Sequence, residues 1–541
     1  MLRDIKKNNI RWTVRDGLDE DILENIYPRL KAFADYPEFS IVKDNNVRTV
    51  LFLKPEDNAS NRIFVKLYKK GGPGVKAKHI AIPSKAYSEW KGLNYFVKKG
   101  LPCPSPLAFS EKKRFGLLED SCLLIEAIPS SFPLNEYLEN NILEPGIKND
   151  LIISIARLIK NLHNYNIFYR DLHAGNILIR ENQGAAFELF FIDLHKAAFP
   201  KKISTWMKIK DIAQFLNSLL FSKENRFLFL KEYLGNSNES LKLFSQKVAI
   251  KQNKLKNIRV KSRSKRCVKK SSVFEIMKNS KETYYGRKDF GKKETGTVLA
   301  LHALNKKNKN GTVLKNSEKS VITIVEREGK DPLCVKENNF INIFYALKNM
   351  FRKSRSLKSW IAANGLMVRG LDTPLPRAVV DKKFGPFVIK SYIISSFMKE
   401  AKELNDYIDI FKNPEQLKNK SAFITACAMI FKKLHDREIY HADLKSNNIL
   451  VTAGKSKSWK FYFVDLDRVL FSTKISFYQR ANNLAQLNAS ISKLMTVKDR
   501  LKFFYFYAKD TQLYQHRKKY YQRILKISRT KITGIYDISF K

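Results

Sequence analysis

Two groups of polar residues in this sequence have the types and spacing that phosphoryl transfer requires. In the first group Asp171 is followed five residues later by Asn176, and Asp193 closes the apolar segment that comes next. Phosphoryl transfer needs a carboxylate that orients the attacking hydroxyl and oxygen ligands that hold Mg²⁺ on the nucleotide phosphates. This spacing is typical of a kinase catalytic loop. It predicts Asp171 as the hydroxyl-orienting base, with Asn176 and Asp193 as metal ligands.

The same pattern occurs a second time. Asp443, Asn448 and Asp465 stand 272 positions after the first three residues, and Leu162 and His163 recur at the same offset. A lone Asp and Asn in a turn could merely satisfy backbone groups. A constant offset across polar and apolar positions instead indicates a duplicated domain. We therefore predict Asp443 as a second base, with Asn448 and Asp465 as its metal ligands.

A kinase also needs a strand lysine that contacts the nucleotide phosphates. Lys66 lies in an alternating apolar segment and is predicted for this role, and Lys336 lies 270 positions later. A helix is expected over residues 84–100, with Tyr87, Trp90 and Val97 at spacings close to an apolar stripe. Glu89 lies beside that stripe and is placed to pair with Lys66, although either charge could instead be a solvated surface group. Lys66, Glu89 and Lys336 are the predicted ATP-binding residues.

The second half lacks an equivalent of the helix glutamate. Ser359 stands opposite Glu89, and no acidic residue occurs between Asn338 and Gly370. Glu337 is adjacent to Lys336 in a predicted strand, so its side chain should point to the other face. The second half either positions its lysine differently and stays active, or acts as a scaffold. Its intact base and metal residues favour activity.

The residue two positions after each predicted base also differs between the halves. His173 occupies this position in the first half and Lys445 in the second, and a cation here can neutralise a transferring phosphoryl group. Both are therefore candidates for contacting it. Neither half has a GxGxxG loop, since the corresponding segments KDNNVR and LKNSEKS contain no glycine. This absence argues against an ordinary eukaryotic-type protein kinase.

Composition permits two kinase-sized domains and favours polyanionic partners. The chain has 541 residues, 44% hydrophobic and 12% aromatic, so each half can bury a core. Lys and Arg outnumber Asp and Glu by 100 to 52, a net charge of +48. Such a charge fits an anionic lipid surface, a phosphorylated glycan or nucleic acid. A generally lysine-rich proteome explains it almost as well, because the basic residues lie throughout the chain.

The cysteines and the N-terminus indicate an intracellular protein. The five cysteines are odd in number and lack metal-ligand spacing, so we expect a reducing compartment without structural disulfides. The first residues contain no apolar signal core, and no apolar run is long enough to cross a bilayer. We therefore expect a cytoplasmic location.

These patterns predict an α+β fold made of two tandem protein-kinase-like domains. Each should have a small β-rich N-lobe and a mainly α-helical C-lobe, over residues 1–248 and 249–541. A stretch dense in Lys and Arg, at about 249–270, is interpreted as a linker that runs into the second domain. The segment IRV within it (258–260) and SSVFEI after it have strand character. A nucleic-acid-binding arm is the alternative interpretation.

The chain resembles the lipopolysaccharide core kinase family, which phosphorylates Kdo or heptose in the inner core of bacterial lipopolysaccharide. The resemblance is carried by YRDLHAGNIL and FFIDLHKA in the first half, and by YHADLKSNNIL and FVDLDRV in the second. The segments SEWKGLNYFVKKGLPCPSPLA, KSWIAANGLMVRGLDTPLPRAVV and AQLNASI add to it. It covers most of both halves.

The resemblance implies ATP as phosphate donor, Mg²⁺ as the metal, with Mn²⁺ as a second candidate, and the lipopolysaccharide core glycolipid as acceptor. It implies work at the cytoplasmic face of the inner membrane, where an anionic surface could hold the protein peripherally; nucleic acid is not an expected partner. Carried over residue by residue, it repeats the roles given above: base for Asp171 and Asp443, phosphate contact for Lys66 and Lys336, and metal for Asn176, Asp193, Asn448 and Asp465. The tandem arrangement and the missing helix glutamate depart from the family pattern.

Three functions are therefore compared. The leading one is an ATP-dependent phosphotransferase that phosphorylates a Kdo or heptose hydroxyl of the inner core. An atypical bacterial Ser/Thr protein kinase is the nearest alternative. A kinase-like scaffold that binds anionic partners ranks third, because the catalytic-type residues are intact in both halves.

Overall fold

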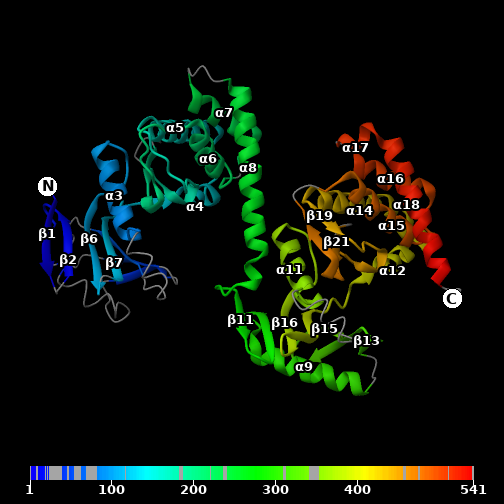
Figure 1. Ribbon diagram of the computed structural model, residues 1–541. Coiled ribbons are helices and arrows are strands. Elements are labelled where there is room, and N and C mark those ends of the chain that lie inside the picture. The colour runs from blue at the N-terminus through cyan, green and yellow to red at the C-terminus, as the bar shows by residue number, and fades with distance from the viewer. Residues whose placement is uncertain are drawn as a thin grey trace. The chain divides into compact units, whose positions relative to one another are not determined.

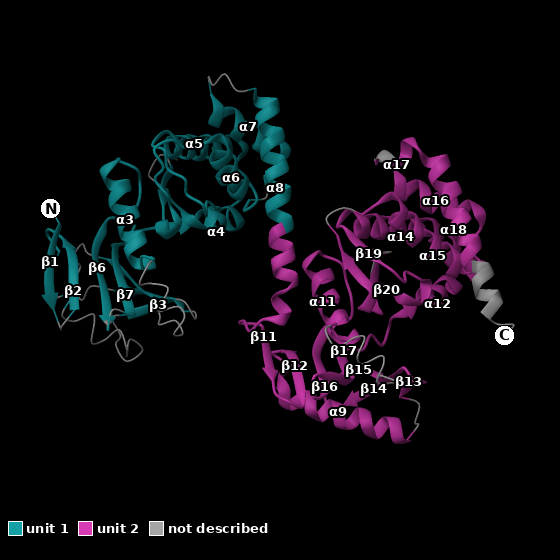
Figure 2. Ribbon diagram, in the orientation of Figure 1, with its two compact units in different colours: residues 1–257 teal, residues 258–541 magenta. Residues whose placement is uncertain are grey.

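The structure is a computed structural model in which the chain divides into two compact units, residues 1–257 and 258–541 (Figure 1, Figure 2). It describes residues 2–7, 10–18, 20, 22–23, 39–44, 48–53, 62–68, 82–115, 117–181, 187–219, 221–235, 240–308, 312–339, 352–454, 458–472, 475–509 and 511–538. In each unit a sheet-rich lobe precedes a helical lobe, as the sequence predicted.

An antiparallel seven-stranded sheet forms the N-terminal lobe of the first unit, in the order β1-β2-β6-β7-β5-β4-β3. Its strands are β1 (Leu2–Lys7), β2 (Ile10–Arg15), β3 (Phe39–Asp44), β4 (Arg48–Leu53), β5 (Ile63–Tyr68), β6 (Pro106–Arg114) and β7 (Leu117–Glu126). Side chains alternate between the two faces. Val65 of β5 joins the core on one face, whereas Lys66 and Tyr68 point to the other.

Helix α3 (Lys85–Lys98) covers that second face and contacts β5, β6 and β7. Ser84 caps it by accepting a hydrogen bond from a first-turn amide, which satisfies one of the unpaired donors there. Its buried apolar residues recur every three or four positions: Ala86, Trp90, Leu93 and Phe96. Glu89 is buried beside this stripe, so the helix brings a carboxylate into the lobe.

The C-terminal lobe of the first unit is mainly helical. Its elements are β8 (Ser131–Pro133), α4 (Leu134–Asn140), α5 (Pro145–Asn164), η2 (Ala174–Asn176), β9 (Ile177–Glu181), β10 (Phe187–Phe191), η3 (Leu194–Lys196), α6 (Thr205–Leu216), α7 (Lys223–Leu234) and α8 (Leu241–Ser264). A small antiparallel sheet, β10-β9-β8, carries the turns next to the predicted catalytic residues. Helix α5 buries its apolar side in a core shared with α3, α6 and α7.

The second unit repeats this plan. Its large sheet has the equivalent order β11-β12-β16-β17-β15-β14-β13. The elements of its N-terminal lobe are β11 (Phe274–Lys278), β12 (Glu282–Arg287), α9 (Gly291–Asn308), β13 (Val313–Ser317), β14 (Ser320–Arg327), β15 (Lys330–Asn339), α11 (Arg355–Val368), β16 (Pro376–Phe384) and β17 (Phe387–Ser396). Helix α11 corresponds to α3, and α9 contacts β12 and β14.

The second C-terminal lobe again combines short strands with helices. Its elements are β18 (Lys402–Glu403), α12 (Leu404–Ile408), η5 (Asp409–Lys412), α13 (Pro414–Leu417), α14 (Lys420–Asp436), β19 (Ile439–His441), η6 (Ser446–Asn448), β20 (Ile449–Ala453), β21 (Trp459–Phe463), η7 (Leu466–Arg468), β22 (Val469–Phe471), α15 (Phe477–Ser490), α16 (Val497–Ala508), α17 (Gln512–Gln515) and α18 (Arg517–Ile538). Figure 1 shows α16, α17 and α18 together at one end of this lobe. Helix α18 packs on α15.

The division between the units falls within helix α8. The strand character suggested by residues 258–260 is wrong, because these residues lie in this helix. Lys, Arg and Gln are good helix formers and outnumber the β-branched residues here. Phe244 and Val248 anchor the start of the helix in the core of the first unit at a helical spacing. In the described part of the chain, no helix is long and apolar enough to cross a membrane.

Candidate functional site

The predicted catalytic loop of the first unit joins α5 to β9. The backbone amides of Tyr169 and Arg170 donate to the carboxylate of Asp211, on α6, at 2.7 and 3.0 Å. Arg170 adopts a left-handed conformation, φ 67°, which turns the chain sharply before Asp171. The side-chain amide of Asn176 then donates to the backbone carbonyl of Asp171 at 3.0 Å. The five-residue spacing thus closes a short, internally bonded loop.

Asp193 follows strand β10 beside this loop. The backbone N–H of Ile192 donates to the carbonyl of Asn176 at 3.0 Å, and the hydroxyl of Tyr169 donates to the carbonyl of Ile192. Asp193 is left-handed, with φ 65° and ψ 51°. Few residues other than glycine adopt this region. The turn ends the strand and directs the Asp193 carboxylate to Arg48 of the N-terminal lobe.

The buried hydroxyl of Tyr169 lies beside this loop, where it donates to the backbone carbonyl of Ile192. Burial raises the pKa of Tyr169 well above its usual range, and the negative charges of Asp193, Glu89 and Asp171 raise it further. The structure brings a predicted metal ligand and the helix glutamate together, since ligand atoms of Asp193 and Glu89 lie within 4.8 Å of each other. The turn that carries Asp193 is in turn bonded to the loop of the predicted base, Asp171, through the Ile192 amide and the Asn176 carbonyl.

Lys66 and Glu89 form the ion pair that the sequence predicted. Lys66 Nζ donates to Glu89 Oε1 at 2.5 Å, and the two side chains are 9% and 1% exposed. The hydroxyl of Tyr68 donates to Glu89 Oε2 at 2.6 Å. Both carboxylate oxygens are therefore satisfied, which a buried charge requires. The contact is confirmed, whereas the roles of the two residues in ATP binding remain predictions.

Two residues not predicted from the sequence bind the carboxylate of Asp193. Arg48 donates from both terminal nitrogens, to Oδ1 at 3.0 Å and to Oδ2 at 2.9 Å, and His195 Nδ1 lies 2.7 Å from Oδ1. Burial opposes ionisation of Asp193, but the hydrogen bonds from His195 and Arg48 and the charge of Lys66 hold its pKa well below the usual range. Asp193 is therefore an anion at neutral pH.

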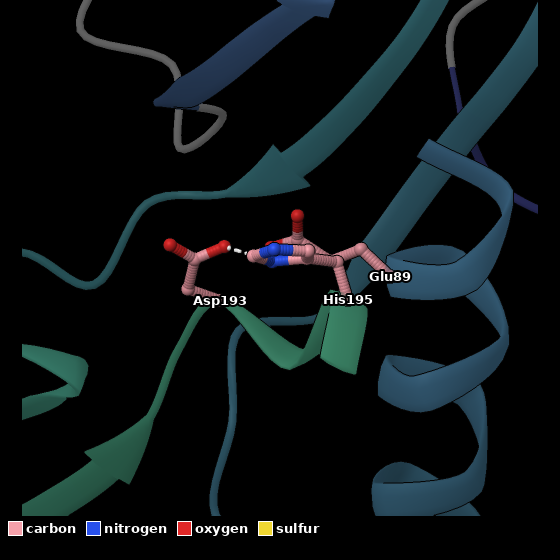
Figure 3. A group of neighbouring side chains, drawn as sticks. All are labelled: Glu89, Asp193 and His195. Atoms are coloured by element: carbon pink, nitrogen blue, oxygen red, sulfur yellow. Dashed lines mark hydrogen bonds and ion pairs between the residues drawn. The ribbon is translucent and has the colours of Figure 1, made fainter. Parts of the chain in front are cut away.

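Figure 3 shows Asp193 and His195 on the turn after β10, with Glu89 projecting from α3. One ligand atom of each residue lies within 4.8 Å of the others, as in a metal site. Glu89 is already bonded to Lys66 and Tyr68, however. The group is thus part of an ion-pair network in which Lys66 and Arg48 offset the charges of Glu89 and Asp193.

The remaining predicted residues of the first unit surround the base. Lys196 Nζ lies 2.5 Å from Asp171 Oδ2, in a pair that is half exposed on the lysine side. His173 is partly buried and lies against Gly175, where a Cβ would stand 3.2 Å from its Nδ1. The role of His173 as a phosphoryl contact remains a prediction.

The catalytic loop of the second unit has the same construction. The Asn448 side chain donates to the backbone carbonyl of Asp443 at 2.7 Å, and Asp465 is left-handed at φ 54°. His441 takes the place of Tyr169. Its Nδ1 accepts from the amide of Asp443 at 3.2 Å, so its Nε2 carries the proton and donates to the Val464 carbonyl at 3.2 Å. Burial lowers the pKa of His441, which keeps the ring neutral.

The lysine of the second unit has a different partner. Lys336 Nζ lies 2.5 Å from Asp465 Oδ1, and the side chain of Ser359, on α11, is partly buried where the first unit has its glutamate. Glu337 points to the opposite face, as predicted, where it meets His302 at 3.1 Å and Lys306 at 3.0 Å. The His302 hydrogen bond lowers the pKa of Glu337 to about 2 despite its burial. Glu337 therefore cannot substitute for the missing helix glutamate.

The register of the sheets shows what replaces Arg48. Val50 pairs with Lys66 in the first unit and Ile322 pairs with Lys336 in the second, so Ser320 occupies the position of Arg48. The predicted metal ligand Asp193 is therefore paired with an arginine, whereas its equivalent Asp465 is paired with Lys336. Lys445 Nζ lies 3.2 Å from Asp443 Oδ1 and is more than half exposed. Its phosphoryl-contact role also remains a prediction.

Comparison with known proteins identifies the family. The sequence profile of the lipopolysaccharide kinase (Kdo/WaaP) family matches residues 38–233 and 341–507, one region in each unit. The chain belongs to this family. The 3-deoxy-D-manno-octulosonic acid kinase of Haemophilus influenzae is 26% identical over 180 residues, which are 32% of this chain and 71% of that protein. The lipopolysaccharide core heptose(I) kinase WaaP of Pseudomonas aeruginosa is 24% identical over 187 residues, 31% and 68% of the two chains.

A solved structure of WaaP in complex with acyl carrier protein matches with a TM-score of 0.35 and 17% sequence identity, over 46% of this chain and 99% of that chain. Membership of the Kdo/WaaP family makes the chain a kinase, with ATP as its phosphate donor. It also confirms the predicted α+β, kinase-like fold in tandem, since each unit carries one match.

Proposed function

We propose that this protein transfers the γ-phosphate of ATP to a hydroxyl group of Kdo or heptose in the inner core of lipopolysaccharide. The observation that carries this proposal is the cluster of Glu89, Asp193 and His195 beside the bonded loop of Asp171 and Asn176, with Lys66 held on Glu89. The acceptor class rests on the family, whose relatives include a 3-deoxy-D-manno-octulosonic acid kinase and a heptose kinase.

In the first unit each residue has a role that follows from its position. Asp171 orients the sugar hydroxyl and accepts its proton as the bond to phosphorus forms. Lys66 neutralises the nucleotide phosphates, and Glu89 holds the Lys66 ammonium in place. Lys196 contacts the base and can stabilise the charge of the transferring group, and His173, two residues after the base, is the second candidate for this role.

The donor set at Asn176 and Asp193 suits a small divalent cation. Asn176 uses its amide nitrogen on the Asp171 carbonyl, so Oδ1 is its remaining ligand atom, and Asp193 is ionised. Carboxylate and amide oxygens are the ligands that Mg²⁺ and Mn²⁺ prefer. When bound, Mg²⁺ would supply positive charge that offsets the negative charge developing on the phosphate group.

We propose a second phosphotransferase site on Lys336, Asp443, Asn448 and Asp465. The bonded loop at Asp443 supports it, since the base and metal residues have the geometry found in the first unit. The functional domains would be residues 1–248 and 249–541, with 249–270 as the linker. Val248 is the last fully buried residue in the core of the first unit, although Leu255 of the same helix still packs against that core.

For the location, we propose peripheral attachment to the cytoplasmic face of the inner membrane. The exposed face of α18 is basic and, over residues 517–531, carries no acidic residue: its exposed cations are Arg517, Lys518, Lys519, Arg523, Lys526 and Arg529. Leu501 and Tyr505 are also exposed on the neighbouring helix α16. Basic side chains beside exposed apolar and aromatic ones suit an anionic lipid surface.

The test of the function offers two acceptors side by side. Labelled ATP and Mg²⁺ would be given to the protein together with dephosphorylated lipopolysaccharide core or a generic protein acceptor. Label on the glycolipid that disappears when both Asp171→Ala and Asp443→Ala are present supports the sugar-kinase proposal, and the single variants assign the sites. Label on protein alone would replace it with an atypical protein kinase, and label on neither would favour a scaffold.

A further inference from the structure

Arg48 occupies an unusual place in the first unit. It is the first residue of β4, so it directly follows the β3–β4 connection, residues 45–47, which lie outside the described residues. In protein kinases, the connection between the two strands that precede the lysine-bearing strand covers the nucleotide phosphates. The Arg48 side chain is 18% exposed, and its guanidinium holds both oxygens of Asp193, across the space between the lobes.

The sequence of this connection explains why a cation is needed there. A glycine-rich loop brings backbone amides close to phosphates because glycine has no Cβ. The segment KDNNVR has no glycine. A guanidinium at its end can bind phosphate in the same bidentate way in which it binds a carboxylate. Arg48 can therefore supply charge and hydrogen bonds that a glycine-rich loop would otherwise provide.

The contact of Arg48 with Asp193 is incompatible with the proposed metal role of that carboxylate. A guanidinium and a metal ion on the same carboxylate repel each other strongly at such short range. Arg48 must therefore leave Asp193 when a metal-loaded nucleotide binds. The phosphates of that nucleotide are anions to which its positive charge can then turn.

We propose that Arg48 is a nucleotide-binding residue of the first unit, which exchanges the carboxylate of Asp193 for the β- and γ-phosphates of ATP. This inference rests on the proposed function of the first site. It adds Arg48, which the sequence motifs did not predict, to the residues of that site. The second unit has Ser320 at this position and pairs Lys336 with Asp465 instead. The exchange is therefore a property of the first unit alone.

The test measures binding to the full-length chain by calorimetry, with Lys336→Ala present throughout to weaken the second site. The probes are the non-hydrolysable analogue AMP-PNP with Mg²⁺, and AMP, which lacks the β- and γ-phosphates. Arg48→Met should weaken AMP-PNP binding by roughly tenfold or more, because it removes charge-assisted hydrogen bonds, and leave AMP binding unchanged. Arg48→Lys keeps the charge but not the bidentate geometry and should fall between.

Arg11→Met is the matched control, since it removes an exposed arginine from β2, where Arg11 pairs with Asp4. If Arg48→Met and Arg48→Lys bind AMP-PNP as tightly as the control, Arg48 only neutralises Asp193 and the inference is wrong. Equal weakening of AMP and AMP-PNP would also overturn it, because the effect would then not lie at the phosphates. No nucleotide binding even in the control would instead contradict the proposed function.

Discussion

Lys336 Nζ lies 2.5 Å from Asp465 Oδ1, in direct contact with the residue proposed to hold the metal in the second unit. The corresponding lysine of the first unit, Lys66, is instead paired with Glu89. Arg48 forms the ion pair with Asp193, the equivalent of Asp465. The second unit has no equivalent of Glu89, so Lys336 pairs with Asp465 instead, because a cation in a partly buried site requires an anion. The two units differ in how their lysine is positioned before nucleotide binds.

Replacing Lys66 by Ala should reduce kcat/KM for ATP more than replacing Lys336 does. The loss should be roughly 10²–10³, the usual effect of removing a preorganised charge from a reacting group. Lys66 is already positioned by Glu89, whereas Lys336 must first leave Asp465. Steady-state kinetics at varied ATP checks this, with the base of the other site replaced in each case. Lys66→Ala is therefore measured in an Asp443→Ala background, and Lys336→Ala in an Asp171→Ala background. Lys382→Ala, a surface lysine paired with Glu282, is the control, and equal losses at the two sites would contradict the prediction.

In an Asp443→Ala background, which removes the base of the second site, Asp171→Asn should lower kcat by roughly 10²–10⁴, the range for loss of a general base, with little change in KM for ATP. The loop should survive, because Asn176 bonds to the backbone carbonyl of Asp171 rather than to its side chain. Single-turnover transfer to the glycolipid measures the chemical step. Asp150→Asn, on the exposed surface of α5, is the matched control. A change in KM alone would mean that Asp171 binds substrate without taking part in proton transfer.

Much of this site follows from local sequence patterns. The repeat locates both catalytic loops, and strand alternation correctly places Glu337 on the face opposite Lys336. Helical spacing correctly brings Glu89 to Lys66. Each of these relations depends on one element or on two neighbouring ones, whose periodicity is visible in the chain.

The missed residues depend on long-range packing instead. Arg48 and Asp193 are 145 residues apart, and their contact needs both the sheet register and the closure of the two lobes. Asp211 lies in a helical pattern that gives no sign of its bonds to the catalytic loop. The helix at residues 258–260 was also missed, because short β-branched runs do not distinguish a strand from a helix.

The stability of the second unit should depend on pH through His435. Burial lowers the pKa of His435 to about 3, from an ordinary value of 6.5. Below pH 6.5 the unfolded chain therefore binds a proton that the folded chain does not, so stability falls as the pH decreases. The expected contribution is about 2 kcal/mol between pH 7.5 and pH 5.

His435→Gln should remove this contribution. The variant loses the hydrogen bond between His435 Nδ1 and the Tyr507 hydroxyl, so it should be less stable at pH 7.5 but lose less stability on acidification. Urea unfolding at both pH values, compared with the unaltered protein, measures the difference. His163 in the first unit is also buried and contributes equally to both proteins. Identical pH slopes would show that His435 is not titrating on unfolding.

Ser359→Glu should make the second site more like the first. Ser359 lies on α11 at the position that Glu89 occupies on α3, so a carboxylate there can draw Lys336 away from Asp465. We expect tighter Mg²⁺-dependent nucleotide binding and higher turnover at the second site, by several-fold, because the lysine is then preorganised. An Asp171→Ala background isolates that site in the transfer assay.

Lys358→Gln is the matched control for Ser359→Glu, because it makes the same change in net charge at an exposed neighbouring position of α11. The reciprocal variant, Glu89→Ser, should free Lys66 from α3 and weaken the first site, since nothing else in the described part of α3 offers Lys66 a carboxylate. If Ser359→Glu behaves like its control while Glu89→Ser still weakens the first site, a missing glutamate is not what distinguishes the units. The difference would then lie with Arg48 and Ser320.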